Sequence, residues 1–150
     1  MITLSHAASI SKAKIETLHK DFKRKVMSWY EACCQEGLLP YVYEGFRSLQ
    51  RQKELYAIGR SLPGKIVTNA DVGQSFHNYG MAIDWVPLQR VAKAEGMYED
   101  VWGKPKEEEL YRKGQAIANK YGLRHLTWER PHLEDASFSD WRDLRNKVVL

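Results

Sequence analysis

The feature that most constrains the fold is a short apolar segment with one carboxylate in it, Met81-Ala-Ile-Asp-Trp-Val86. Its composition predicts a buried strand, which we expect to stop at Pro87 because proline cannot donate to a sheet. Alternation along the strand turns Asp84 to the face opposite Ile83 and Trp85. An ionised carboxylate there is costly unless a cation or hydrogen bonds compensate it. The fold must therefore supply Asp84 with a partner.

The rest of the sequence predicts a single α+β domain over residues 1–150. The chain is 43% hydrophobic and 28% charged, which is ordinary for a globular protein with its own core. Apolar periodicity predicts an N-terminal helix over about 11–34 and a helix over 107–121. A strand is expected over 41–47, and a short C-terminal helix over about 138–146, capped by Ser137 or Ser139 and packing Trp141 and Leu144.

Ser48 is the expected N-cap of another helix, which runs to Gly59. Its apolar residues are expected to be buried: Leu49, Leu55, Tyr56 and Ile58. Residues 59–78 are expected to form a loop, residues 89–105 are ambiguous and loop-rich, and 123–128 and 132–134 are short extended pieces.

Charge and cysteine content exclude several classes of protein. The net charge of +4 is too small and scattered to favour a nucleic-acid partner. No apolar run approaches the roughly 20 residues that cross a bilayer, so we expect no membrane insertion. The N-terminus has no secretory signal, and the adjacent Cys33 and Cys34 fit a reducing compartment. These features predict synthesis in a cytoplasm.

His77 and His132 are the histidines that can join Asp84 in a metal site. His77 stands in a glycine-containing loop seven residues before Asp84, and imidazole and carboxylate both bind zinc at about 2.0–2.2 Å. A structural hydrogen bond between His77 and Asp84 explains that pair equally well. His132 follows Pro131 in an extended segment and would complete a set of two histidines and one carboxylate, which is typical of catalytic zinc.

Two glutamates lie close enough in sequence to His132 to act as the base in such a site. Zinc lowers the pKa of its water to about 7, so an ordinary carboxylate can accept the proton. Glu129 lies three residues before His132, and Glu134 lies two residues after it. Spacing alone does not choose between them.

Three segments, in order along the chain, resemble motifs of the M15 metallopeptidases. Ser75-Phe-His-Asn-Tyr-Gly-Met-Ala-Ile-Asp84 resembles the Ser-x-His-x-x-Gly-x-Ala-x-Asp signature, and Gly45-Phe-Arg-Ser-Leu-Gln-Arg-Gln52 resembles Gly-x-Arg-(Ser/Thr)-x-x-x-Gln. Glu129-Arg-Pro-His132 resembles the terminal (Asp/Glu)-x-x-His element. The resemblance covers about residues 40–134, the expected catalytic core, and is greatest to the L-alanyl-D-glutamate peptidases of bacteriophage endolysins.

This resemblance implies a role for each matching residue. His77, Asp84 and His132 take the positions of the zinc ligands, and Glu129 that of the catalytic base. Arg47 matches the arginine that binds substrate and polarises the scissile carbonyl. Two further positions, Gln52 and Ser75, match residues on the substrate side of the metal loop. The implied fold is an antiparallel sheet flanked by helices, as in D-alanyl-D-alanine carboxypeptidases and the hedgehog domain.

The implied function is that of a zinc-dependent endopeptidase that cleaves the L-alanyl-D-glutamate bond in the stem peptides of bacterial peptidoglycan. As a phage endolysin, it would be a monomer that accumulates in the host cytoplasm and reaches the wall through a membrane pore. A D-alanyl-D-alanine carboxypeptidase and a non-catalytic zinc-stabilised binding module are the alternatives. Glu129 and Arg47 argue against the binding module, which needs neither.

One segment departs from the family pattern. Residues 122–129 are shorter than in many members and lack a Gly-Gly pair, which affects the expected shape of the cleft wall. Trp85, Trp102 and Trp128 could line a cleft or stack on sugar, although packing in the core is the usual role of tryptophan.

Overall fold

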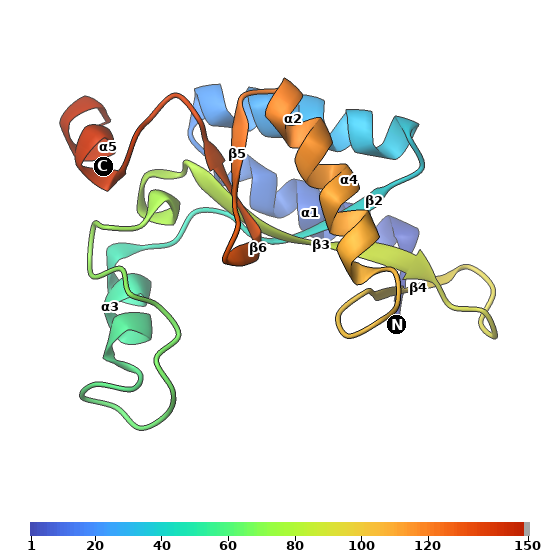
Figure 1. The fold of residues 1–150 in the computed structure, drawn as a ribbon, viewed down its shortest axis with the longest axis horizontal. Coiled ribbons are helices and arrows are strands. Elements are labelled where there is room, and N and C mark those ends of the chain that lie inside the picture. The colour runs from blue at the N-terminus through green and yellow to red at the C-terminus, as the bar shows by residue number, and fades with distance from the viewer. Residues whose placement is uncertain (149–150) are drawn as a thin grey trace.

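A computed structural model describes residues 1–148 of the chain. In chain order its elements are β1 (Ile2–Thr3), α1 (Leu4–Glu16), α2 (Lys20–Gln35), β2 (Leu39–Glu44), α3 (Leu49–Ala57), the 3-10 helix η1 (Phe76–Tyr79), β3 (Ala82–Arg90), β4 (Met97–Asp100), α4 (Glu107–Lys120), β5 (Leu123–Leu126), β6 (Glu129–Asp135) and α5 (Trp141–Lys147). Within this range the six strands form one antiparallel sheet in the order β1-β4-β3-β6-β5, with β2 also paired to β3 (Figure 1). The α+β fold is the one that the sequence predicts.

β3 is the central strand of the sheet. One edge pairs with β2, and the other pairs with β6 near residues 82–84 and with β4 near residues 88–90. The expected stop at Pro87 is therefore wrong. Pro87 lies opposite Pro40, and on its other edge it falls between the stretches paired with β6 and β4, so its missing N–H interrupts no ladder.

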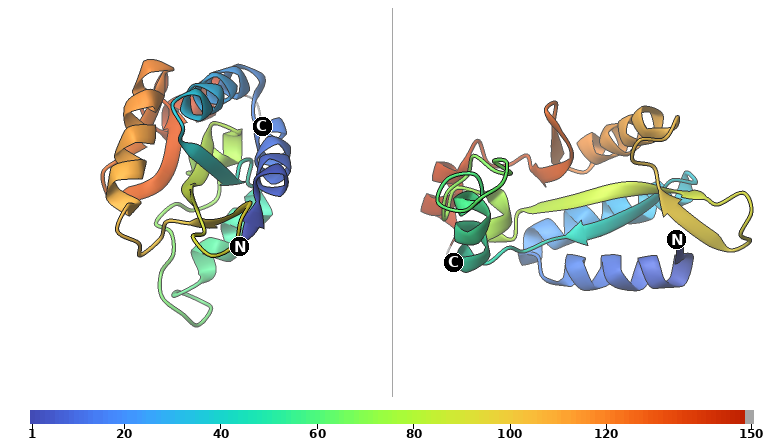
Figure 2. Two further views of the ribbon diagram at one scale, coloured as in Figure 1. Left: turned by 90° about the vertical axis from the view of Figure 1, so that its right-hand side faces the viewer. Right: turned by 90° about the horizontal axis from the view of Figure 1, so that it is seen from below.

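Three helices cover one face of this sheet. Figure 2 shows α1, α2 and α4 arranged around the strands. The fully buried Trp85 packs edge-on against Trp29 of α2 and Tyr111 of α4, with ring centroids 5.0 and 5.1 Å apart. Because side chains alternate along β3, Asp84 points away from this core to the opposite face.

The expected helix over 11–34 is two helices, α1 and α2, separated at residues 17–19. Other parts of the fold hold the polar groups at this break. The Thr17 hydroxyl donates to the Lys14 carbonyl and accepts from the Phe46 amide, while the His19 amide donates to the Gly80 carbonyl at 3.1 Å. Tertiary hydrogen bonds thus replace those that a continuous helix would make.

Other element boundaries also differ from the expectations. The strand expected at 41–47 is Leu39–Glu44, and the loop-rich segment at 89–105 contains the end of β3 and β4. The segment expected to be a loop at 59–78 ends in η1. The C-terminal helix begins at Trp141 and is capped by Asp140, rather than by Ser137 or Ser139.

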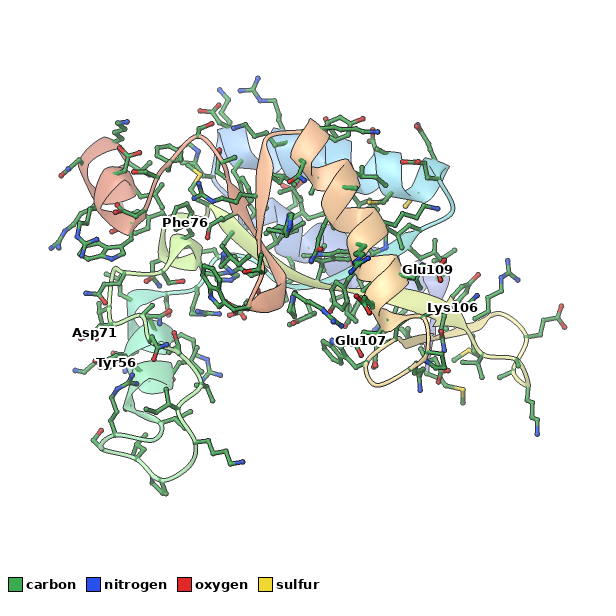
Figure 3. The ribbon with its side chains drawn as sticks, viewed as in Figure 1. Tyr56, Asp71, Phe76, Lys106, Glu107 and Glu109 are labelled. Carbon is green, nitrogen blue, oxygen red and sulfur yellow. The ribbon has the colours of Figure 1, made fainter. Side chains whose placement is uncertain are left out.

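α3 and the loop after it form an arm beside the sheet, on which Figure 3 labels Tyr56 and Asp71. Ser48 caps α3 as predicted. The expected burial of its apolar residues is wrong, because Leu49 is 40% exposed and Gln52 is the one buried residue of the helix. Among residues 1–148, no helix has both the length and the apolar character that spanning a bilayer requires.

Candidate metal centre

His77 is held in place by the short helix η1. The Ser75 hydroxyl accepts from the His77 amide. It also accepts from the Asn78 amide while the Asn78 side chain accepts from the Ser75 amide, and this reciprocal pair is a capping box. Gly80 ends the helix with a φ of +67° and lies so close to His19 that an added Cβ would be 2.7 Å from its nitrogen. Only glycine fits this position, which explains the glycine in the signature.

The segment after β2 packs directly on η1. The Arg47 amide donates to the His77 carbonyl at 2.9 Å, and the Asn78 side-chain amide donates to the Arg47 carbonyl at 3.0 Å. The Gly45 carbonyl lies 2.8 Å from His77 Nδ1. A Cβ at Gly45 would lie 2.5 Å from the Lys14 carbonyl oxygen, so a side chain there would push this segment away from α1.

The three predicted ligands meet on the face of the sheet away from the helices. Asp84 of β3 lies opposite His132 of β6 in the strand register, and η1 brings His77 to the same place. Asp84 Oδ1 is 3.3 Å from His77 Nε2 and 3.6 Å from His132 Nδ1. One ligand atom from each residue lies within 4.8 Å of the others, and all three residues are buried.

In each histidine, the ring nitrogen that does not face Asp84 lies within hydrogen-bonding distance of another group. The Gly45 carbonyl holds His77 Nδ1, so Nε2 faces Asp84. Glu134 Oε1 holds His132 Nε2 at 2.8 Å, so Nδ1 faces Asp84. Arg124 in turn holds the other oxygen of Glu134 through Nε at 3.0 Å and through Nη2. Such outer partners fix the ring orientation of metal-binding histidines.

The charges in this cluster shift several pKa values. Burial opposes ionisation of Asp84, but the two imidazoles outweigh burial and hold its pKa well below the usual range. Burial also disfavours a charged His132, yet the neighbouring carboxylates of Asp84 and Glu134 raise its pKa to about 9. The pKa of Glu134 is lowered because His132 and Arg124 outweigh its burial. The site thus favours an ionised Asp84 with a compensating positive charge beside it.

This arrangement fits a divalent metal ion. Among residues 1–148, His77 Nε2 and Asp84 Oδ1 are buried and have no hydrogen-bond partner, although buried polar atoms are normally paired. Two ligand atoms about 2 Å from one zinc ion at a tetrahedral angle lie roughly 3.3 Å apart, close to the observed separations of 3.3 and 3.6 Å. The structural hydrogen bond considered as an alternative for His77 and Asp84 is not formed.

A cleft of about 1100 Å³ opens above these residues. Its walls come from α3, the loop at 67–70, the β5–β6 hairpin and the start of α5. Arg47 lies in this cleft with Nη2 3.8 Å from Asp84 Oδ2, and Glu44 holds its Nε at 2.8 Å. Burial lowers the pKa of Arg47, but Glu44 and the other nearby carboxylates raise it overall, so the guanidinium stays charged.

Glu129 and Glu134 occupy different positions in the cleft. Glu129 is exposed at the start of β6, beside the hairpin turn, whereas Glu134 is buried. No ion pair to Glu129 is formed among residues 1–148, whereas Glu134 is paired with both His132 and Arg124. Only the first carboxylate is therefore free to exchange protons with a molecule in the cleft.

Two residues expected on the substrate side, Gln52 and Ser75, make hydrogen bonds within the protein. Gln52 is 0% exposed, and its amide accepts from Arg47 Nη1 at 2.9 Å and donates to the Ala70 carbonyl at 2.6 Å. It therefore ties Arg47 to the arm and does not reach the cleft surface. Ser75 borders the cleft, but its hydroxyl caps η1.

The tryptophans divide between core and cleft. Trp85 is in the core, as tryptophan usually is, whereas Trp128 is 79% exposed and lines the cleft. Sequence reasoning did not find the roles of Glu44, Gly45 and Arg124, because tertiary contacts determine them. His125 also borders the cleft, from β5.

A family model described as VanY, D-alanyl-D-alanine carboxypeptidase, matches residues 15–141. The chain belongs to this family of M15 peptidases. The matched range contains η1, β3 and β6, and so all three residues of the candidate metal centre.

A curated relative supports the same family. The peptidoglycan L-alanyl-D-glutamate endopeptidase CwlK of Bacillus subtilis (strain 168) is 44% identical over 68 residues, which are 45% of this chain and 41% of CwlK. The match thus spans less than half of the relative's length.

Solved structures share the fold at low sequence identity. The Serratia marcescens L-Ala D-Glu endopeptidase ChiX aligns over 93% of this chain and 90% of its own, with a TM-score of 0.57 and 17% identity. A D,D-pentapeptidase VanY E175A mutant, solved in complex with Zn(II), aligns over 79% of this chain and 72% of its own, with a TM-score of 0.53 and 16% identity. Zinc in a structure of this family agrees with the predicted zinc cofactor and with the His77, Asp84 and His132 cluster.

Proposed function

We propose that this protein is a zinc-dependent peptidase that cleaves the L-alanyl-D-glutamate bond in peptidoglycan stem peptides. The observation that carries the proposal is the convergence of His77, Asp84 and His132 at the base of an open cleft, beside Arg47 and the exposed Glu129. The choice of the cleaved bond rests on CwlK and ChiX, since both are described as L-alanyl-D-glutamate endopeptidases.

His77 Nε2, Asp84 Oδ1 and His132 Nδ1 would hold the metal. A bound zinc ion supplies Lewis acidity and lowers the pKa of water to about 7. The remaining steps belong to side chains of this chain. Arg47, held by Glu44 and Gln52, points its Nη2 toward Asp84 and can donate to the oxygen of the scissile carbonyl as negative charge develops there.

Glu129 is the proposed base. It accepts the proton from the attacking water and returns it to the departing nitrogen, which completes the hydrolysis. Its exposure and its freedom from ion pairs within residues 1–148 support this role. Glu134 is assigned to orienting His132, because the Arg124 ion pair and the imidazole hydrogen bond occupy both of its oxygens.

Digestion of purified peptidoglycan tests the proposal. We expect new amino groups on D-glutamate and new carboxyl termini on L-alanine, loss of this activity with a chelator, and its return with zinc. Release of free D-alanine would instead identify the carboxypeptidase alternative, which the family description and a VanYB structure in complex with D-alanine-D-alanine both favour. Tight zinc binding without cleavage of either bond would point to a binding module.

The biological setting and the monomeric state stay predictions. The support for a phage endolysin is the resemblance over about residues 40–134, which is greatest to that branch. Expression in a Gram-negative host with and without a pore-forming membrane protein tests it, and we expect lysis only when both proteins are made. Sedimentation of the purified protein tests the monomer.

A further inference from the structure

We propose that Arg51 recognises a carboxylate of the substrate, and so makes the enzyme selective for acidic stem peptides. The inference deepens the proposed function and rests on it. Arg51 lies on α3 and borders the same cleft as the candidate metal centre. It lies outside the motif residues to which the family resemblance assigns a role.

The other two arginines of the cleft are already engaged by the protein. Arg47 is bonded to Glu44 at 2.8 Å and to Gln52 at 2.9 Å. Arg124 is bonded to Glu134 and to the Phe138 carbonyl. Neither guanidinium can turn to a new partner without leaving a buried group unpaired.

The guanidinium of Arg51, in contrast, is only weakly engaged by the protein. Its contact among residues 1–148 is with Glu54, at 3.5 Å between Nη1 and Oε2, and the two side chains are 57% and 51% exposed. An ion pair of this length and exposure contributes little, so a better-placed carboxylate can replace it. Within the described cleft lining, Arg51 is therefore the arginine whose whole guanidinium group remains free to pair with a carboxylate of a ligand.

Its position suits a substrate that extends from the metal along the arm. Arg51 and Leu55 are one helical turn apart, and both border the cleft opposite the loop at 67–70. Figure 3 shows this arm standing beside the sheet, with Tyr56 and Asp71 marking its helix and its loop. His77, Asp84 and His132 border the same cleft as Arg51, so one bound peptide can contact both.

The charge balance of the cleft explains why a cation is needed here. Glu44, Asp84, Glu129, Glu134 and Asp140 all border it, so an anionic peptide would meet several carboxylates. A guanidinium binds carboxylates through two parallel hydrogen bonds, which gives selectivity as well as affinity. In the proposed substrate, D-glutamate is linked onward through its side chain and keeps a free α-carboxylate beside the scissile amide. A peptide that ends in D-alanine offers a terminal carboxylate of the same chemistry.

The test compares Arg51→Gln with the wild type on two synthetic stem peptides. One contains D-glutamate and the other contains D-isoglutamine, in which an amide replaces the α-carboxylate. We expect the variant to lose roughly 10- to 100-fold in kcat/KM on the acid, mostly through KM, and to cleave the amide as the wild type does. Arg112→Gln, an exposed arginine of α4 outside the cleft lining, is the matched control. Thermal unfolding of all three proteins should be alike.

A second pair of peptides distinguishes the two sources of carboxylate. These end in D-alanine with a free or an amidated C-terminus, and a loss confined to the free terminus would assign Arg51 to that group. Equal losses on acid and amide, or no loss on any acidic peptide, would overturn the proposal. If the wild type cleaves none of these peptides, the proposed function fails. Calorimetric titration of the zinc-loaded protein then decides the role of Arg51, because an acid preference that the variant lacks supports it and equal binding contradicts it.

Discussion

The base and the walls of the cleft are built in different ways. At the base, His77, Asp84 and His132 are buried and come from η1 and the two paired strands β3 and β6. The walls carry exposed apolar side chains, with Val67 of the arm and Trp128 of the hairpin 60% and 79% exposed. The base is part of the folded core, whereas the walls stand outside it.

The contacts that hold each region differ in the same way. The base is fixed by strand pairing and by hydrogen bonds to buried groups, such as that between His77 and Gly45. The arm is held by a few polar bonds, among them those from Gln52 to Ala70 and from Arg60 to Thr68. Positions that carry out the chemistry therefore depend on the stability of the whole domain, while positions that select the substrate can change at small cost.

The largest expected effect is that of Glu129→Gln, at the border between the two regions. Loss of a general base lowers the rate by about 10²- to 10⁴-fold. Because Glu129 is exposed, we expect the melting temperature to stay the same, and because it is not a ligand, zinc content should stay at one ion per chain. Kinetics on purified wall, together with metal analysis and thermal unfolding, check all three points. Full activity in this variant would remove Glu129 from the mechanism.

Glu134→Gln should produce a different defect, because this residue belongs to the base of the cleft. Loss of a carboxylate that orients a metal-binding histidine lowers metal affinity by about 10- to 100-fold. Activity should therefore fall at low zinc and recover at high zinc, as measured by titrating zinc into the metal-free variant. The Glu129 variant should show no such recovery. A Glu134 variant that stays inactive when fully loaded with zinc would identify Glu134 as the general base.

Local patterns predicted which face of the sheet Asp84 occupies. Alternation along the strand turned Asp84 away from Ile83 and Trp85, and the structure has the three proposed ligands on that face. The same rule could have found the role of Glu134, because residues two apart on a strand share a face and His132 is two positions earlier.

The features that sequence reasoning missed depend on distant partners. β3 continues through Pro87 because Pro40 lies opposite it and because neither β6 nor β4 pairs with it on the other edge. The residues at the break between α1 and α2 bond to Gly80 and Phe46. Gln52 is buried because the loop folds back and brings the Ala70 carbonyl to it. None of these pairs is close in sequence, so no local sequence pattern could predict them.

Gly114→Ala tests how closely the core beneath the site is packed. Alanine favours a helix over glycine by about 1 kcal/mol, but a Cβ here would lie 2.2 Å from the ring of the buried Trp85. Overpacking of this kind typically costs about 1–3 kcal/mol. We expect a net loss of stability in denaturant unfolding, whereas Asn119→Ala, at an exposed position of α4, should change stability by no more than about 0.5 kcal/mol. A more stable Gly114 variant would mean that α4 can move away from the sheet without cost.

The smallest expected effect is on the cleft wall, at Trp128. This indole is 79% exposed, stands in the turn between β5 and β6, and forms no aromatic pair among residues 1–148. Trp128→Ala should therefore change the free energy of unfolding by no more than about 0.5 kcal/mol. A mostly exposed side chain that borders the cleft is available to a ligand, so KM should rise by about 2- to 10-fold, the loss expected for one aromatic contact, while kcat stays unchanged. A fall in kcat instead would mean that the hairpin turn positions Glu129. The cleft wall would then contribute to the chemical step as well as to substrate binding.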